Sequence, residues 1–225
     1  MNNYRNELKP CDESCPLCGG TGFIDCGDEG FALCPNDPRR FRDTGVRESD
    51  LDVPKKLKPT ATLKNIDKAL KGLLDTRSGM AYIAGSYGIG KTVTAKAYTA
   101  KAVRVFEGGV YYRRASELVN WLRKSYDTEH GQVEYQRRLD AIKNANWLVI
   151  DELGRDRMTD FARESLNEIV DARYMGAIQE LNATVLLSNF TPEQVFEPYV
   201  VDRIMDEKNT YLNLRTVSLR TNTLR

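Results

Sequence analysis

A glycine-rich loop between an apolar run and a helical segment constrains this chain more than any other feature. Residues Gly85 to Thr92 read GSYGIGKT, which fits the pattern G-x-x-x-x-G-K-[ST]. The apolar run Met80–Ala84 predicts a strand before the loop, and the pattern after it predicts a helix over Thr92–Phe106. Glycines let backbone N–H groups turn inward, and a helix N-terminus adds partial positive charge. The motif therefore predicts a polyphosphate-binding loop in an α/β fold.

The residues of this loop have separate expected roles. Lys91 would reach the β- and γ-phosphates, and the Thr92 hydroxyl would ligate Mg²⁺. The remaining cofactor-binding positions of the loop are Gly85, Gly88, Ile89 and Gly90. The chain has no Asn-Lys-x-Asp element of the kind that reads guanine. We therefore expect ATP with Mg²⁺ as the ligand.

An acidic pair predicts the second half of the same site. Asp151 and Glu152 directly follow Trp147–Ile150, which reads as a buried strand. A carboxylate at the carboxyl end of a parallel strand faces the ligand crevice of an open α/β sheet. Asp151 would hold Mg²⁺, directly or through water, and Glu152 would orient the attacking water. The alternative is an Asp-Glu pair that only ends a strand.

A polar amide ends the next apolar run at the corresponding place. Asn189 follows Ala183–Leu187, a second predicted buried strand, with one serine between them. At that edge of the sheet it could help to position the water. An ordinary strand-terminating asparagine is the competing interpretation.

From residue 76 onward, short apolar runs alternate with longer helical patterns. Such alternation implies a mainly parallel sheet with helices on both faces. The other predicted elements are strands over Gly109–Tyr112 and Tyr211–Leu219, helices over Ser116–Tyr126 (Ser116 as N-cap), Tyr135–Lys143 and Phe161–Tyr174, and a short helix opened by Thr191. We divide the chain into a cysteine-rich segment (1–50), a linker with a leading amphipathic helix (51–75) and an α/β ATPase domain (76–225).

All five cysteines lie in the first segment, between Cys11 and Cys34. Cys15 and Cys18 form a C-x-x-C knuckle before a glycine-rich turn, and such a pair can bind one Zn²⁺. Cys26 and Cys34 are expected to complete a structural Cys₄ zinc site, with Cys11 as a spare that could replace Cys26. Metal would supply folding free energy that so short a segment lacks. Unligated reduced thiols are the alternative.

Several motifs stand together in an order that is typical of one family. They are GSYGIGKT, LVIDELG, IVDARY at 169–174, LLSNF at 186–190, VDRIMDE at 201–207 and TVSLR at 216–220. Residues from about 60 to 225 therefore resemble the AAA+ ATPases of the DnaC/IstB group, which comprises replicative helicase loaders and transposition ATPases. The cysteine knuckle is similar to those at the head of phage-type helicase loaders. The resemblance implies a P-loop NTPase fold of the AAA+ type.

The resemblance also implies roles for two arginines near the end of the chain. Arg203 matches the arginine finger, which acts on the nucleotide of a neighbouring subunit and would make hydrolysis depend on assembly. Arg220 matches a later sensor arginine, with Arg215 as a rival. A surface ion pair or a solvated charge is the alternative for both roles. Glu207 departs from the family, because some members carry a basic residue there.

Overall charge does not decide whether the chain binds DNA, because 33 basic residues offset 32 acidic ones. A local basic and aromatic group could track a phosphate backbone and stack on bases. Its members are Arg113, Arg114, Trp121, Arg123, Lys124 and Tyr126. A plain amphipathic helix with a solvated face would give the same pattern, although the resemblance favours single-stranded DNA.

The leading hypothesis is an ATP-hydrolysing helicase loader that binds a replicative hexameric helicase and single-stranded DNA and self-associates into an oligomer or spiral. The second hypothesis is an IstB-type transposition ATPase, with duplex DNA and a transposase as partners. A third is an adaptor that binds ATP but barely hydrolyses it, and Glu152 argues against it. The polar N-terminus and the lack of an apolar run of about 20 residues lead us to expect a cytoplasmic protein with no membrane partner.

Overall fold

The computed structural model describes residues 11, 13–27, 31–53, 57–127, 130–155, 158–179 and 182–214. Its strands are β1 (Phe23–Asp25), β2 (Phe31–Leu33), β3 (Gly79–Gly85), β4 (Val110–Arg114), β5 (Trp147–Leu153), β6 (Ala183–Ser188) and β7 (Thr210–Leu214). Its α-helices are α1 (Ala61–Thr76), α2 (Lys91–Val105), α3 (Ala115–Arg123), α4 (Gly131–Lys143), α5 (Asp160–Ile178) and α6 (Pro198–Ile204). Short 3₁₀ helices are η3 (Pro38–Phe41), η4 (Glu48–Leu51), η6 (Lys124–Asp127) and η7 (Pro192–Gln194).

The larger sheet has five strands in the order β4-β5-β6-β3-β7, and every neighbouring pair is parallel. Strand β3 therefore lies inside the sheet, next to β6, with the acidic strand β5 one place further. Because the carboxyl ends of parallel strands share one edge, this order brings the loop after β3 and the ends of β5 and β6 together. The predicted α/β class with a parallel central sheet is confirmed.

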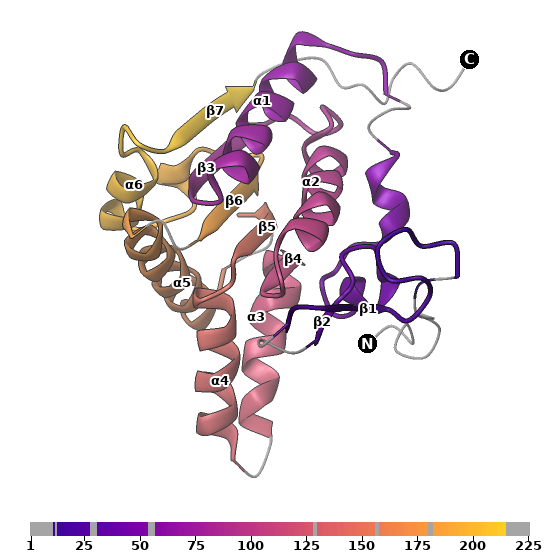
Figure 1. The fold of residues 1–225 in the computed structure, drawn as a ribbon. Helices are drawn as coiled ribbons and strands as arrows, with labels where there is room; N and C mark the ends of the chain where they lie inside the picture. Colours follow the sequence, from indigo (N-terminus) through magenta and orange to yellow (C-terminus); the bar gives the residue numbers. More distant parts are fainter. Residues whose placement is uncertain are drawn as a thin grey trace, which may run out of the picture.

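Two apolar cores cover the two faces of this sheet, as the helix layers in Figure 1 suggest. One core joins residues of α3, α4, α5 and α6 to side chains such as Tyr82, Ile150 and Leu186. The other joins residues of α1 and α2 to the opposite faces of the same strands, including Ile83 and Val149. Strands with both faces covered are continuously apolar, which explains why the sequence shows runs here instead of alternation.

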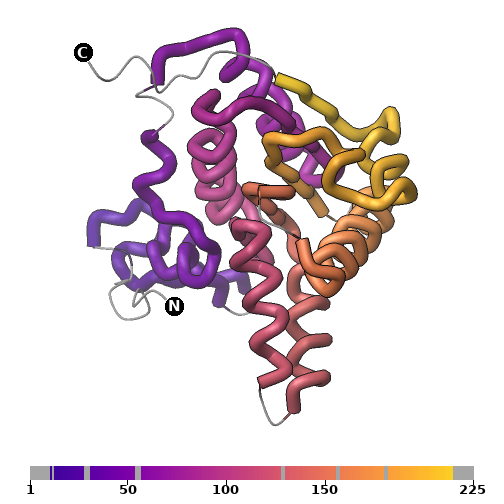
Figure 2. Tube along the Cα trace, turned by 180° about the vertical axis from the view of Figure 1, so that it is seen from behind, coloured from indigo at the N-terminus to yellow at the C-terminus, as the bar shows by residue number. Residues whose placement is uncertain are grey.

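The N-terminal segment packs on the β4 edge of the sheet, and Figure 2 shows it from behind, against α2. Phe41 and Val46 are buried in the same core as α2. The carbonyl of Thr44 accepts a hydrogen bond of 2.7 Å from the backbone N–H of Tyr112 on β4. The guanidinium of Arg40 donates to the carbonyl of Phe106, which caps α2. The edge strand is thus covered by chain from the cysteine-rich part of the protein.

Element boundaries differ from the predictions in several places. The helix expected at Ser116 begins at Ala115, and Arg114 is its N-cap, so the prediction of Ser116 as the cap is wrong. Strand β4 runs directly into this helix, which leaves no turn for a serine cap. Helix α5 starts at Asp160, with the Thr159 hydroxyl accepting from the N–H of Ala162 at 3.2 Å.

The last strand and the end of the chain are described only in part. Strand β7 begins at Thr210 and is described to Leu214, whereas the prediction ran from Tyr211 to Leu219. The later residues of that prediction lie outside the described part of the chain. No helix among the described residues has the length and apolar character that a bilayer span requires.

A buried arginine on α5 joins three elements of the core. The side chain of Arg173 is fully buried, and its guanidinium donates five hydrogen bonds. Three go to carbonyls of Ile142, Lys143 and Ala145 at the end of α4, and the other two go to Thr184 Oγ1 and the Ala183 carbonyl of β6. A cation at a helix C-terminus also interacts favourably with the helix dipole.

Candidate functional site

The loop between β3 and α2 depends on its glycines. Gly88 and Gly90 have φ values of 77° and 97°, in the left-handed region that other residues rarely adopt. A Cβ on Gly85 would lie 2.5 Å from the carbonyl oxygen of Leu214 and 2.6 Å from Ile89 Cδ1. Ile89 is buried and packs the loop onto the sheet. The sequence thus folds this loop into one compact turn at the N-terminus of α2.

Lys91 is the first residue of α2, and its side chain folds back over the loop. Its ammonium donates to the carbonyls of Gly85 and Ser86 at 2.6 and 3.0 Å and to Asn189 Oδ1 at 2.9 Å. Burial lowers the pKa of Lys91 to about 8, because the charged form loses hydration. The structure therefore brings Lys91 and Asn189 together, as their places at the same sheet edge suggested.

Thr92 and Asp151 form a second contact across the site. The Thr92 hydroxyl donates to Asp151 Oδ2 at 2.8 Å, and Asp151 is only 3% exposed. Tyr112 also donates its hydroxyl to Asp151 Oδ2. Hydroxyl and carboxylate oxygens are the ligands that Mg²⁺ prefers, so this pair fits the metal that accompanies a bound triphosphate.

Glu152 has an unusual backbone and two cationic neighbours. Its φ of 58° places a non-glycine residue in the left-handed region, and its N–H donates to Asp151 Oδ1 at 2.7 Å. Its carboxylate lies 2.8 Å from Arg155 Nη1 and 3.7 Å from Arg114 Nε. Strain of this kind collects at functional sites, and here it falls where the pairing of β5 with β6 is irregular, between Ile150 and Leu153.

Of the arginines to which the resemblance gives roles near the end of the chain, the structure describes only Arg203. Arg203 lies on α6, forms an ion pair with Asp171 and stacks 5.1 Å from the ring centroid of Tyr174. Among the described residues, its ion pair and its ring contact are both with α5. Arg220 and its rival Arg215 lie outside the described residues.

Sequence reasoning missed three residues that contact the acidic pair. Tyr112 binds Asp151, while Arg114 and Arg155 pair with Glu152. The first two could have been found only if β4 were already known to lie next to β5, because a strand in that place ends beside the same carboxylates. In the structure the register pairs Arg114 with Asp151. Which strand neighbours β5 is a long-range choice that the local sequence does not encode.

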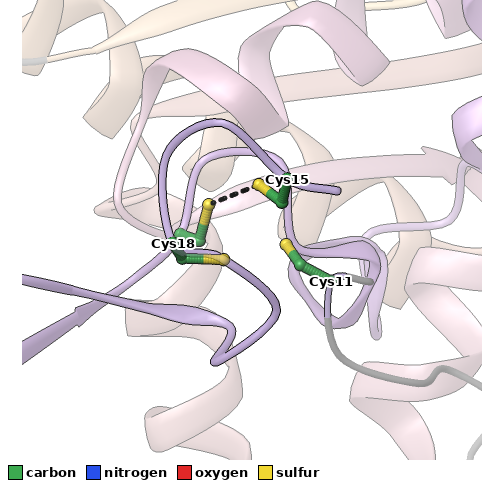
Figure 3. Close-up of side chains that lie close together, drawn as sticks. Cys11, Cys15 and Cys18 are labelled. Atoms are coloured by element: carbon green, nitrogen blue, oxygen red, sulfur yellow. Dashed lines mark hydrogen bonds between the residues drawn. The ribbon is translucent and has the colours of Figure 1, made fainter. Parts of the chain in front are cut away.

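Four thiols gather at the N-terminal segment, and Figure 3 shows three of them converging. The sulfur atoms of Cys11, Cys15, Cys18 and Cys34 all lie within 4.8 Å of one another. Cys15 Sγ and Cys34 Sγ are 3.8 Å apart. Four sulfurs around one tetrahedral zinc at about 2.3 Å would be separated by about 3.8 Å. The cluster could therefore hold a metal ion.

Backbone groups donate hydrogen bonds to both thiols of the knuckle. A hydrogen bond from the backbone of Leu17 lowers the pKa of the Cys15 thiol to about 6. The N–H of Gly22 donates to Cys18 Sγ at 3.3 Å. Burial raises the pKa of the Cys34 thiol, so a cation is needed to balance the charge if all four sulfurs are thiolates.

The ligand set expected for the cysteine site needs one correction. The sequence predicts Cys26 as a ligand, but in the structure Cys26 is exposed and directs its sulfur at the carbonyl of Ile24. Cys11, expected as the spare, takes its place in the cluster. The reason is the β1-β2 hairpin, which pairs Asp25 with Phe31 and carries the residue after β1 away from the knuckle.

Comparison with known proteins gives relatives that act in DNA replication. The chain is 23% identical to the replicative helicase loader DnaI of Bacillus subtilis over 151 residues, which is 66% of this chain and 45% of that protein. The chain thus spans less than half the length of this curated relative.

Solved structures show the same fold. A crystal structure of DnaI superposes with a TM-score of 0.57 at 17% identity, covering 76% of this chain and 95% of that one. A crystal structure of the DnaC helicase loader gives 0.54 at 21% identity, covering 78% and 98%. The likeness shows that this chain shares the fold of these proteins, with its parallel central sheet.

The family model for IstB-like ATP binding proteins matches residues 47–207. The match includes the glycine-rich loop, the acidic pair and Asn189, which the structure places around one site. Because it covers well over half of the sequence, the chain belongs to the family of IstB-like ATP binding proteins.

Proposed function

We propose that this protein is an ATP-dependent loader of a replicative helicase. It would bind a hexameric helicase and single-stranded DNA, assemble with its own copies into an oligomer or spiral, and hydrolyse ATP with Mg²⁺ in the cytoplasm as replication initiates. The observation that carries the proposal is a cysteine cluster held on the edge of an IstB-like ATP-binding core. Similarity to the helicase loader DnaI supports it.

The groups around the loop suit hydrolysis of ATP. Lys91 and the N-terminus of α2 would hold the phosphates, and Thr92 and Asp151 would hold Mg²⁺, which would neutralise charge on them. Glu152 would accept a proton from the attacking water, and Asn189 would help to orient that water. Glu152 pairs with Arg155 in the structure, so it would leave that contact to act on the water.

We assign the partner-docking role to residues 1–50, linked through 51–75 to the ATPase domain over 76–225. Four thiolates leave no open position for water on a tetrahedral Zn²⁺, so the cluster would be structural. A zinc-stabilised head would present its exposed apolar side chains to the helicase. These side chains include Leu17, Phe23 and Phe31.

Protein purified without chelator should contain about one zinc ion per chain. Cys11→Ser should lose that ion, whereas Cys26→Ser should keep it, because Cys11 lies in the thiol cluster and Cys26 does not. Elemental analysis, and the charge-transfer absorption of a Co²⁺-substituted sample, would measure the difference. Equal loss in both variants would contradict this ligand set, and zinc-free native protein would remove the metal from the proposal.

The proposed DNA surface lies on α3 and the turn after it. Arg114, Arg123 and Lys124 are exposed there. Other members of the sequence-predicted group are engaged within the chain, because Arg113 donates to the carbonyl of Tyr112 at 2.8 Å and Trp121 lies under the guanidinium of Arg138. Since Arg114 also approaches Glu152, bound DNA would lie next to the nucleotide site.

Co-elution with purified hexameric replicative helicases, in ATP and in ADP, tests the loader proposal. We expect a complex whose amount differs between the two nucleotides, because ATP binding and turnover would switch the protein between holding and release. A double variant, Cys15→Ser with Cys18→Ser, should lose the helicase and still bind a fluorescent ATP analogue. Recovery of a transposase and no helicase from a host lysate would instead support the IstB-type alternative.

A further inference from the structure

Tyr112 contacts both the nucleotide site and the N-terminal segment. Its side chain is 5% exposed and lies between β5 and α2, where its hydroxyl donates to Asp151 Oδ2. The same carboxylate oxygen accepts the Thr92 hydroxyl at 2.8 Å. Two hydroxyl donors therefore converge on one oxygen of the carboxylate that would hold Mg²⁺.

The side chain of Tyr112 acts only as a donor here. Its hydroxyl donates to Asp151 Oδ2, a carboxylate oxygen that can only accept. The ammonium of Lys96 on α2 lies 5.2 Å from its ring centroid, which fixes the ring between strand and helix. The hydroxyls of Tyr112 and Thr92 thus hold the carboxylate of Asp151 in one orientation.

The backbone of Tyr112 is tied to the N-terminal segment. Its N–H donates to the Thr44 carbonyl at 2.7 Å. Gly45 packs so closely that a Cβ would lie 2.1 Å from the Tyr112 carbonyl oxygen, and its φ of 87° is in the left-handed region. Arg113 reinforces the contact by donating to the carbonyl of Asp43.

We propose that Tyr112 is a positioning residue for Mg²⁺, and that it transmits the position of residues 43–45 to Asp151. The inference rests on the proposed ATP and Mg²⁺ binding of this site. Outer-shell partners orient a ligating carboxylate, and losing one typically costs about 10–100-fold in metal affinity. A partner that shifts the N-terminal segment would move Thr44 and Gly45 and, through them, Tyr112. The affinity of the site for Mg²⁺ would then change.

Tyr112→Phe in the full chain tests the first part, because it removes the hydroxyl and leaves the ring and backbone contacts. Binding of a fluorescent ATP analogue in EDTA should match the native protein. The Mg²⁺ concentration that half-saturates the tighter, metal-dependent binding should rise about 10-fold or more. Mn²⁺ titration by electron paramagnetic resonance should show the same loss without any hydrolysis.

Two further variants complete the test. Tyr98→Phe removes a similar hydroxyl–carboxylate bond, 2.7 Å to Asp67, and should leave the Mg²⁺ dependence unchanged. Gly45→Ala should raise the half-saturating Mg²⁺ concentration although the Tyr112 hydroxyl is intact. A native Mg²⁺ dependence in Tyr112→Phe, or an equal shift in Tyr98→Phe, would overturn the positioning role, and an unshifted Gly45→Ala would overturn the transmission. Native protein that binds no analogue would instead overturn the proposed function.

Discussion

Arg203→Ala should reduce ATP hydrolysis by the assembled protein about 10³–10⁵-fold while leaving nucleotide binding intact. The guanidinium would neutralise charge that develops on the γ-phosphate of a neighbouring subunit, so its loss acts on the transition state more than on the bound ground state. In the described part of the chain, the ion pair and the ring contact of Arg203 are with Asp171 and Tyr174 of α5, on the surface that would face a neighbouring subunit in this proposal. Turnover at saturating protein concentration measures the effect.

A mixing experiment separates a role in trans from general damage. Glu152→Gln would keep a working Arg203 but lack the group that orients water, and Arg203→Ala would have the opposite defect. Each variant alone should be inactive, whereas a mixture should regain activity at interfaces where the intact halves meet. Arg163→Ala removes an arginine that pairs with Glu197 in the cleft beside Asp171 and serves as control. Native rates in Arg203→Ala, or a mixture as inactive as its parts, would contradict the assignment.

The same assay decides whether the protein is an enzyme at all. If native protein and Glu152→Gln hydrolyse ATP equally slowly when assembled, the adaptor interpretation replaces the ATPase. Because Arg203 would act on the nucleotide of a neighbouring subunit, low activity of dilute protein is expected and does not by itself favour an adaptor. The comparison therefore needs the concentration at which subunits associate.

Local sequence was sufficient to predict the parallel strands β3, β5 and β6 and the contacts between residues at their carboxyl ends. The strands β3, β5 and β6 are buried on both faces, so each appears as an apolar run followed by polar residues. Because parallel strands align their carboxyl ends, the loop, the acidic pair and Asn189 could be predicted to meet. Lys91 and Asn189, and Thr92 and Asp151, are indeed in hydrogen-bond contact.

Features that depend on long-range packing could not be predicted in this way. The exchange of Cys26 for Cys11 follows from a hairpin whose strands have three residues each, too short for a periodic signal. The role of Tyr112 requires that β4 lies next to β5, and the covering of that edge by Thr44 requires a contact between distant segments. Neither contact leaves a local pattern in the sequence.

The role of Arg173 also could not be predicted from local sequence. The segment IVDARY is part of the family resemblance, but it does not show what its arginine contacts. Its guanidinium donates to four carbonyls, three at the end of α4 and one on β6. Buried carbonyls that lose their partner cost about 1–3 kcal/mol each, and the structure relaxes only in part. A leucine at this position would fill some of the volume and satisfy none of these groups.

Arg173→Leu should therefore lower the free energy of unfolding by about 3–4 kcal/mol, allowing for the relief of one buried charge. At this chain length that loss corresponds to a fall in Tm of roughly 10 °C. Arg163→Leu makes the same change at an exposed position of α5 and should alter stability by no more than about 0.5 kcal/mol. Thermal unfolding followed by circular dichroism compares the two variants with the native chain. If both unfold at the same temperature, the carbonyls at the end of α4 must find water or other donors, and Arg173 does not hold α4, α5 and β6 together.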